Sequence, residues 1–394
     1  MKRKFYVSAI FLAVLAALEV GSLKLEKRAA VDAAGLEAPM FEVDPMWPKP
    51  LPNHWLLGMT IGVSVDAQDH VWIIHRQGSL EPKEVYMLTN PPGASCCLPA
   101  PPVLEFDQAG NLIGHFGGPG QGYDWPTSNH GVTVDYKGNV WIGGNGAHDG
   151  QVLKFTQDGR FLMQIGKPNM SRGSSDVENL SKPAKLFIDK AANELYVADG
   201  YGNHRVIVFD ADTGKYKRLW GAYGHKPDDT NLGKYDPDAP PAQQFRNPVH
   251  CAELANDGLV YVCDRVNDRI QVFRKDGTFV KEQFIEKRTL GDGSVWDIAF
   301  SNDPQQKYIY LADGANEKVH ILLRDTLQTL TSFGDGGRQP GAFYAVHSIA
   351  TDSKGDIFTT ETYHGQRVQK FVYKGLGPVT KQDQGVLWPK SASR

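Results

Sequence analysis

The sequence has no long apolar segment and no concentration of basic residues. Its most apolar run, Phe5–Leu18, has 14 residues, whereas a helix that crosses a bilayer needs roughly 20. The formal net charge is −3. Because nucleic-acid binding needs clustered charge that neutralises phosphate groups, this composition argues against a nucleic-acid partner.

The N-terminus has the features of an export signal. A basic tripeptide, residues 2–4, precedes the apolar run at residues 5–18. No small-x-small cleavage motif follows, so residues 1–23 are expected to form either a signal peptide or an N-terminal membrane anchor. Residues 24–39 are polar and rich in alanine and are expected to form a linker. The remaining chain, residues 40–394, is expected to lie in the periplasm or outside the cell.

Cysteine is scarce, with four residues in the chain. Export makes disulfides permissible. Cys251 and Cys263 are equidistant from Asp257 in a turn, so they should face each other across a hairpin, either as a disulfide or as two small buried thiols. Cys96 and Cys97 are adjacent in a proline-rich loop, where they could form a strained ring, bind a metal or have no function.

Glycine and proline are abundant, with 41 and 24 residues, which favours many turns and argues against long helices. From Met40 onward one pattern repeats: an apolar strand, a turn with glycine, a second apolar strand, a polar loop and a third strand. The segment Asn247–Phe273 shows this pattern most clearly. The copies of the pattern begin at Gly62, His130, Lys185, Asn247, Asp297 and His347.

Six copies of about four strands each predict an all-β fold, a six-bladed β-propeller. The sixth copy lacks an obvious fourth strand, and residues 41–43 are expected to supply it and close the ring. Closure removes sheet edges that would otherwise pair with other chains. Two long inserts, Gln77–Pro101 and Ala222–Arg246, are rich in Pro, Gly and Asp, and such loops usually serve the binding face of a rigid scaffold.

Histidine occupies one repeat position in alternate copies. When the copies are aligned on the residue that ends the first strand, the position five residues earlier is Ile61, His130, Ala184, His250, Trp296 and His347. The first strand of each blade lines the central channel, so the three histidines should converge near the axis. Three imidazoles around one point form the protein part of a catalytic zinc site. A single strand histidine is more often structural, but three at one repeat position favour a metal site.

Three further residues align at the same end of the channel, which we call the mouth. Arg76 and Arg265 end the second strands of the first and fourth copies, and Tyr201 follows the second strand of the third. A nearby metal ion and guanidinium would stabilise a phenolate, so Tyr201 could accept a proton from a substrate hydroxyl. The arginines could orient a substrate carboxylate. Taken singly, each arginine could instead form a surface salt bridge, and the tyrosine could simply pack on its neighbours.

These motifs resemble a known family. ADGYGNHRVIVF and CDRVNDRIQVF are similar to NHL-type propeller repeats, and IIHR, NHGVTVD, PVHCAEL and AVHSIATD are similar to the lyase domain of peptidylglycine α-amidating enzymes. The resemblance covers about residues 55–375. It implies a six-bladed propeller that cleaves a peptidyl-α-hydroxyglycine to a peptide amide and glyoxylate. The site residues that it implies are a base at Tyr201, arginines at Arg76 and Arg265, and zinc ligands at His130, His250 and His347.

One position departs from the family pattern. The family has a structural calcium that is bound partly by an aspartate directly after the last zinc-binding histidine, and this sequence has Ser348 there. The carbonyl groups of Val63 and Val132 match the other calcium ligands by position. Without the carboxylate, a bound calcium is doubtful.

The sequence therefore favours a zinc-dependent carbon–nitrogen lyase that acts on a small-molecule or peptide substrate at the mouth. A gluconolactonase-like hydrolase is disfavoured, because that type binds its metal through carboxylate and amide oxygens, whereas this mouth offers imidazoles. A non-catalytic exported NHL propeller that binds a peptide, a glycan or a partner protein stays open, because fold alone does not give function.

Overall fold

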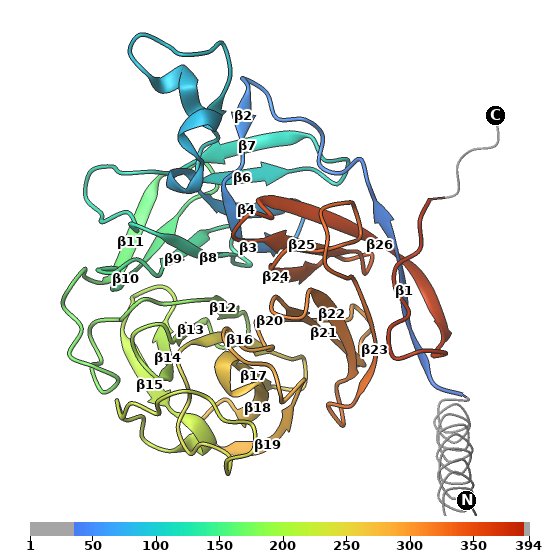
Figure 1. Ribbon diagram of the computed structural model, residues 1–394. Coiled ribbons are helices and arrows are strands. Elements are labelled where there is room, and N and C mark those ends of the chain that lie inside the picture. The colour runs from blue at the N-terminus through green and yellow to red at the C-terminus, as the bar shows by residue number, and fades with distance from the viewer. Residues whose placement is uncertain (1–34, 390–394) are drawn as a thin grey trace, which may run out of the picture.

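The chain folds into a six-bladed β-propeller, as a computed structural model shows (Figure 1), so the predicted fold class is confirmed. The structure describes residues 35–389. The predicted export signal and most of the predicted linker lie outside these residues. Among the described residues, no helix is long and apolar enough to cross a membrane.

The blades follow one another along the chain as antiparallel sheets, and the first strand of each blade lies next to the central channel. Blade one comprises β3 (Met59–Val65), β4 (Val71–Arg76), β6 (Val103–Phe106) and β7 (Leu112–Phe116). Blade two comprises β8 (Asn129–Val134), β9 (Val140–Gly144), β10 (Gln151–Phe155) and β11 (Phe161–Gly166). Blade three comprises β12 (Leu186–Asp189), β13 (Glu194–Asp199), β14 (Arg205–Asp210) and β15 (Tyr216–Trp220). Blade four comprises β16 (Val249–Leu254), β17 (Leu259–Asp264), β18 (Arg269–Arg274) and β19 (Phe279–Phe284). Blade five comprises β20 (Asp297–Phe300), β21 (Tyr308–Asp313), β22 (Lys318–Leu323) and β23 (Thr329–Phe333).

The sixth blade joins the two ends of the propeller. It comprises β24 (Val346–Thr351), β25 (Ile357–Glu361), β26 (Arg367–Pro378) and β1 (Glu37–Asp44). Strand β1 pairs antiparallel with β26, with Phe41 opposite Tyr373, so the predicted closure by residues 41–43 is confirmed. The ring of Phe41 lies 5.3 Å from that of Tyr310 in blade five. Because β1 begins at Glu37, it includes three residues of the segment predicted as a linker.

The aspartate on which the copies are aligned has a structural role. Asp66 directly follows β3, and its carboxylate accepts the backbone N–H groups of Gln68 and His70 in the turn. The same carboxylate accepts Nε1–H of Trp72 at 2.9 Å. Asp135, Asp189 and Asp352 accept turn N–H groups in the same way, which explains why aspartate recurs at this point of the repeat.

The two long inserts differ in how much regular secondary structure they contain. Insert Gln77–Pro101 contains the 3₁₀ turns η1 (Gln77–Ser79) and η2 (Pro82–Leu88) and strand β5 (Leu98–Pro99), which pairs in parallel with β2 (Trp55–Leu56). Insert Ala222–Arg246 begins with the 3₁₀ turn η3 (Ala222–Gly224) and is otherwise without regular structure. A fourth such turn, η4 (Arg265–Asn267), follows β17.

Both cysteine pairs form disulfides. Cys251 and Cys263 are cross-strand partners in the β16–β17 pair, as their equal distance from the turn predicted, and their Cα atoms are 4.8 Å apart. Cys96 and Cys97 form a vicinal disulfide in the first insert. The alternative of free thiols is thus not what the structure shows for either pair.

His75, at the end of β4, should make stability dependent on pH. Its Nδ1 accepts the N–H of Gly58 and its Nε2 donates to the carbonyl of Pro101, so the buried ring is neutral. Burial lowers the pKa of His75 from 6.5 to about 4. The unfolded chain binds the proton more tightly than the folded protein does. The free energy of unfolding is therefore highest above about pH 6.5 and falls as pH decreases toward 4. Between about pH 6.5 and pH 5, we expect the free energy of unfolding of His75→Gln to fall by about 2 kcal/mol less than that of the wild type.

Urea unfolding at both pH values measures this difference. The exposed His148→Gln provides the control and should keep the pH dependence of the wild type. Equal pH dependence in the wild type and in His75→Gln would contradict the assignment.

Candidate metal centre at the channel mouth

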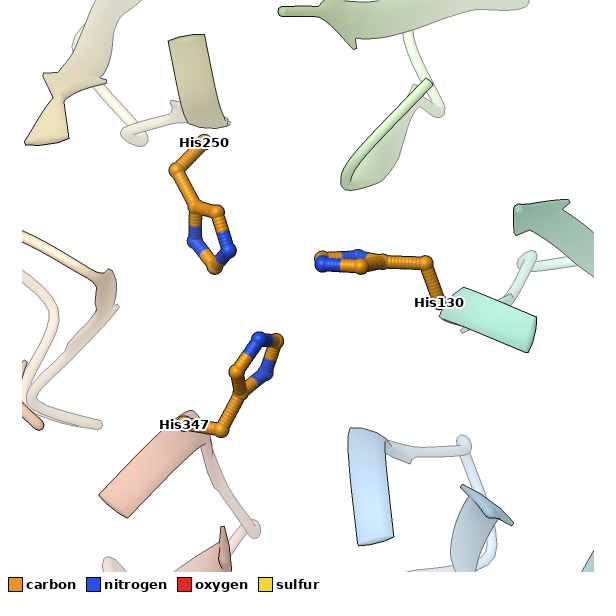
Figure 2. Close-up of side chains that lie close together, drawn as sticks. All are labelled: His130, His250 and His347. Atoms are coloured by element: carbon orange, nitrogen blue, oxygen red, sulfur yellow. The ribbon is translucent and has the colours of Figure 1, made fainter. Parts of the chain in front are cut away.

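Three histidines converge at the propeller axis. His130, His250 and His347 lie on the inner strands β8, β16 and β24, and Figure 2 shows their rings pointing toward one another. The ring centroids are 4.8–5.0 Å apart. One nitrogen from each ring lies within 4.8 Å of the others, and all three side chains are buried. The structure thus brings together the residues that the sequence predicted as metal ligands.

Each histidine stands at an interruption in the pairing of its inner strand. The register shifts between Asn129 and Val132, between Val249 and Cys251, and between Val346 and Ser348. Such a bulge leaves a residue out of the ladder and re-aims its side chain. The same irregularity recurs around Ile61 in blade one. The repeat position that carries histidine is therefore a position where the strand can direct a side chain toward the axis.

The intervening blades orient the imidazoles. Nδ1 of His130 bonds to the carbonyl of Ala184 at 3.0 Å, and Nδ1 of His250 to that of Trp296 at 2.5 Å. Nδ1 of His347 bonds to the carbonyl of Ile61 at 2.6 Å. These three carbonyls belong to the same repeat position in blades three, five and one. Because a carbonyl can only accept, each Nδ1 carries a hydrogen and each Nε2 keeps its lone pair for another partner.

Burial keeps all three rings neutral. It lowers the pKa of His130, His250 and His347 well below 6.5, and the nearby positive groups, which include Arg76 and Arg265, lower it further. A neutral imidazole with a free Nε2 lone pair is the form that binds a metal ion. The donor set therefore fits a three-histidine metal site.

Tyr201 lies directly against the histidines. Its hydroxyl is 3.0 Å from Nε2 of His130 and 3.0 Å from Nε2 of His250. Nη1 of Arg265 donates to the same hydroxyl at 3.1 Å. The guanidinium of Arg265 is buried and stacks over Trp296, 4.4 Å from the ring centroid. Tyrosine, arginine and imidazoles thus share one hydrogen-bond network, as their common alignment predicted.

Arg76 approaches the mouth from blade one and is held by blade two. Its Nε donates to the carbonyl of Asn129 at 3.0 Å, and its Nη2 donates to Oδ1 of Asn145 at 2.8 Å. Burial lowers the pKa of Arg76, and the electrostatic interaction with Tyr201 opposes this shift. Arg76 therefore adds positive charge to the end of the channel that holds Tyr201.

A cavity of about 800 Å³ opens beside Tyr201 and Arg265. Its other walls include Asn247 before blade four, Asp292 before blade five, and Leu232 and Lys234 of the second insert. The volume lies within the usual range of about 300–1,000 Å³ for small-molecule sites. The insert Ala222–Arg246, predicted to serve the binding face, thus lines the space next to Tyr201 and Arg265.

Tyr363 and Asp292 belong to this network and were not predicted. The hydroxyl of Tyr363 donates to Oδ2 of Asp292 at 3.0 Å, and Oδ1 of Asp292 is 3.6 Å from Nη2 of Arg265. Tyr363 stands two residues after the acidic residue that ends the second strand of its blade, the same position that Tyr201 has in blade three. The alignment of the repeats therefore contained a signal that could have predicted Tyr363. Asp292 lies in an irregular loop, where no repeat position marks it.

The fold and the site define a class of protein: a six-bladed NHL-type propeller with three histidines at one end of its channel. No family model matches the chain. The chain is 25% identical over 305 residues to NHL repeat-containing protein 3 of Mus musculus, covering 73% of this chain and 71% of that protein. It is 25% identical over 359 residues to peptidyl-α-hydroxyglycine α-amidating lyase 1 of Drosophila melanogaster, covering 84% of this chain and 59% of that protein.

A shorter match reaches higher identity. The chain is 32% identical over 155 residues to peptidyl-glycine α-amidating monooxygenase B of Xenopus laevis, covering 39% of this chain and 16% of that protein. The chain is thus a distant homologue of the amidating lyases and of NHL repeat-containing protein 3, as its motifs predicted. It spans 16% of the length of the monooxygenase and 59% of that of the lyase.

A solved structure supports the fold alone. A Bacteroides thetaiotaomicron protein of unknown function superimposes with a TM-score of 0.52 at 14% identity, over 86% of this chain and 77% of that chain.

Proposed function

We propose that the protein is an exported, zinc-dependent carbon–nitrogen lyase of the amidating-lyase type. The observation that carries the proposal is the position of the Tyr201 hydroxyl, 3.0 Å from Nε2 of two of the three histidines and 3.1 Å from Arg265. A general base, an electrophilic centre and an anion-binding group within hydrogen-bond reach of one another are what this reaction needs.

The three histidines would hold the zinc ion through Nε2, because Nδ1 of each is occupied by a carbonyl. A zinc ion bound there would supply a Lewis acid for the substrate hydroxyl oxygen. The distant amidating-lyase homologues support this choice of reaction.

Side chains of the protein would accept the hydroxyl proton of the substrate and bind its carboxylate. The substrate is a carbinolamide, in which one carbon carries a hydroxyl, a carboxylate and the amide nitrogen. Tyr201 would accept the hydroxyl proton, and the C–N bond would break as the C=O bond of glyoxylate forms. The electron pair of the broken bond goes to the amide nitrogen, which would take up the proton that Tyr201 accepted, to give the free amide and restore Tyr201. Arg265 and Arg76 would bind the carboxylate and keep its charge beside the reacting carbon.

The cavity beside Tyr201 would take the rest of the substrate. With a volume of about 800 Å³ and an open side, it can accommodate a peptide segment as well as a small molecule. The donors that face it include Lys234 and Asn247. We therefore propose a peptide or small-molecule carbinolamide as the substrate.

Metal analysis combined with a product assay tests the proposal. We expect the purified protein to contain about one zinc ion per chain and to release glyoxylate from a peptidyl-α-hydroxyglycine, with loss of activity on chelation. A fully folded protein that binds no zinc and releases no glyoxylate would overturn the proposal and favour a non-catalytic NHL propeller. Its distant homology to NHL repeat-containing protein 3 is the reason to keep that second function in view.

A further inference from the structure

A partly buried ammonium group lies in the channel beside the histidines. Nζ of Lys185 is 2.7 and 2.8 Å from the two carboxylate oxygens of Asp297 and 2.9 Å from Oε1 of Glu253. Oγ of Ser348 and the backbone N–H of Ile349 donate to Asp297 Oδ2 at 2.7 and 3.1 Å. We call Lys185, Glu253, Asp297 and Ser348 the channel cluster. Its members come from blades three, four, five and six.

The channel cluster separates the histidines from the opposite end of the channel. A narrow cavity is lined both by the three histidines and by Lys185, Asp297 and Ser348. A second cavity, of about 370 Å³, is lined by Lys185 and Glu253 together with residues near the far ends of the inner strands. The cluster therefore closes the channel directly behind the metal site.

Three members of the cluster are joined through the backbone to the groups that fix the imidazoles. Lys185 directly follows Ala184, whose carbonyl binds His130. Asp297 directly follows Trp296, whose carbonyl binds His250. Ser348 directly follows His347 itself. A shift of the cluster would move all three imidazoles.

We infer that Lys185 is a positioning residue of the metal centre, the permanent internal cation that holds the inner strands of blades three to six at the spacing the three histidines need. Two carboxylates this close repel each other unless a cation lies between them. Lys185 supplies such a cation as a side chain that cannot dissociate. The inference rests on the proposed metal site, but not on the lyase reaction.

The affinity for zinc tests this role without reference to activity. We expect Lys185→Met to lower zinc affinity about tenfold to a hundredfold, the usual effect of losing a group that orders metal ligands. Chelator competition measures the affinity. The cobalt-loaded protein should also show a changed visible spectrum, because the three nitrogens no longer meet at one point.

Lys154→Met is the matched control. Lys154 is a buried lysine whose Nζ donates to the carbonyl of Ala211, outside the channel. Zinc affinity and the cobalt spectrum of this variant should be those of the wild type. A wild-type protein that binds no zinc would overturn both the metal site and this inference, whereas wild-type affinity in folded Lys185→Met would overturn the inference alone.

A second variant decides the case in which Lys185→Met fails to fold. Glu253→Gln keeps the ammonium and Asp297 but replaces the second carboxyl group that contacts Lys185 by an amide. We expect a loss of about threefold in zinc affinity, since a hydrogen bond to a charged group is weakened rather than lost. Unchanged affinity and an unchanged cobalt spectrum in Glu253→Gln would overturn the inference.

Discussion

Replacing His250 by alanine should lower the affinity for zinc by about 100- to 1,000-fold and abolish glyoxylate release. Structural zinc sites gain about 10–16 kcal/mol from four ligands, or about 3 kcal/mol from each, and about 1.4 kcal/mol corresponds to a factor of ten. The remaining pair, His130 and His347, would hold the ion only weakly. Metal content after dialysis, together with chelator competition, measures the change.

His320→Ala is the control for this loss. His320 is also buried in a strand, but its Nε2 bonds to Asp313 in blade five, away from the axis. This variant should lose stability and keep zinc. Wild-type zinc affinity in His250→Ala would mean that the three histidines are not the metal site.

Tyr201→Phe should lower the turnover number by about 10²- to 10⁴-fold, the range expected for the loss of a general base. Phenylalanine keeps the ring that packs beside His130 and His250, whose centroids are 5.0 and 5.6 Å away. Only the hydroxyl is lost, and with it the contacts to the two Nε2 atoms and to Arg265. Zinc affinity should therefore change little while glyoxylate release almost stops, a combination that separates this effect from that of His250→Ala.

Tyr308→Phe provides the matched control. The hydroxyl of Tyr308 bonds to the carbonyl of Glu37, where β1 closes the ring. Its removal should leave the turnover number at the wild-type value. If Tyr201→Phe were as active as the wild type, the base would have to be another group at the mouth, and the proposed role of Tyr201 would be wrong.

The repeat made much of the fold and of the histidine centre predictable. Strand periodicity and the aspartate turn are local properties, and they place one residue of each inner strand at the axis whatever the path of the outer loops. The positions of His130, His250 and His347 follow from this. Tyr363 could have been found by the same alignment, because it occupies the repeat position of Tyr201.

The channel cluster could not be predicted in this way. Lys185 and Asp297 are 112 residues apart in sequence, and their contact depends on how many blades close the ring and on its diameter. The second insert, Ala222–Arg246, has no period that would predict its path along the cavity. Asp292 meets Arg265 only because an irregular loop before blade five turns toward the mouth. Such contacts arise from the closed tertiary structure, and a local pattern does not contain them.

The pairing of β1 with β26 determines the order in which this protein can be completed during synthesis. Strand β1, residues 37–44, is among the first described segments of the chain, and β26, residues 367–378, is among the last. Each of blades one to five is built from consecutive strands, but the sixth blade needs a strand from the other end of the chain. Joining segments so distant in sequence is slow, because the long loop must be closed before the contact is formed. Since His347 and Ser348 are carried by the same blade, the metal centre would be assembled only in this last step.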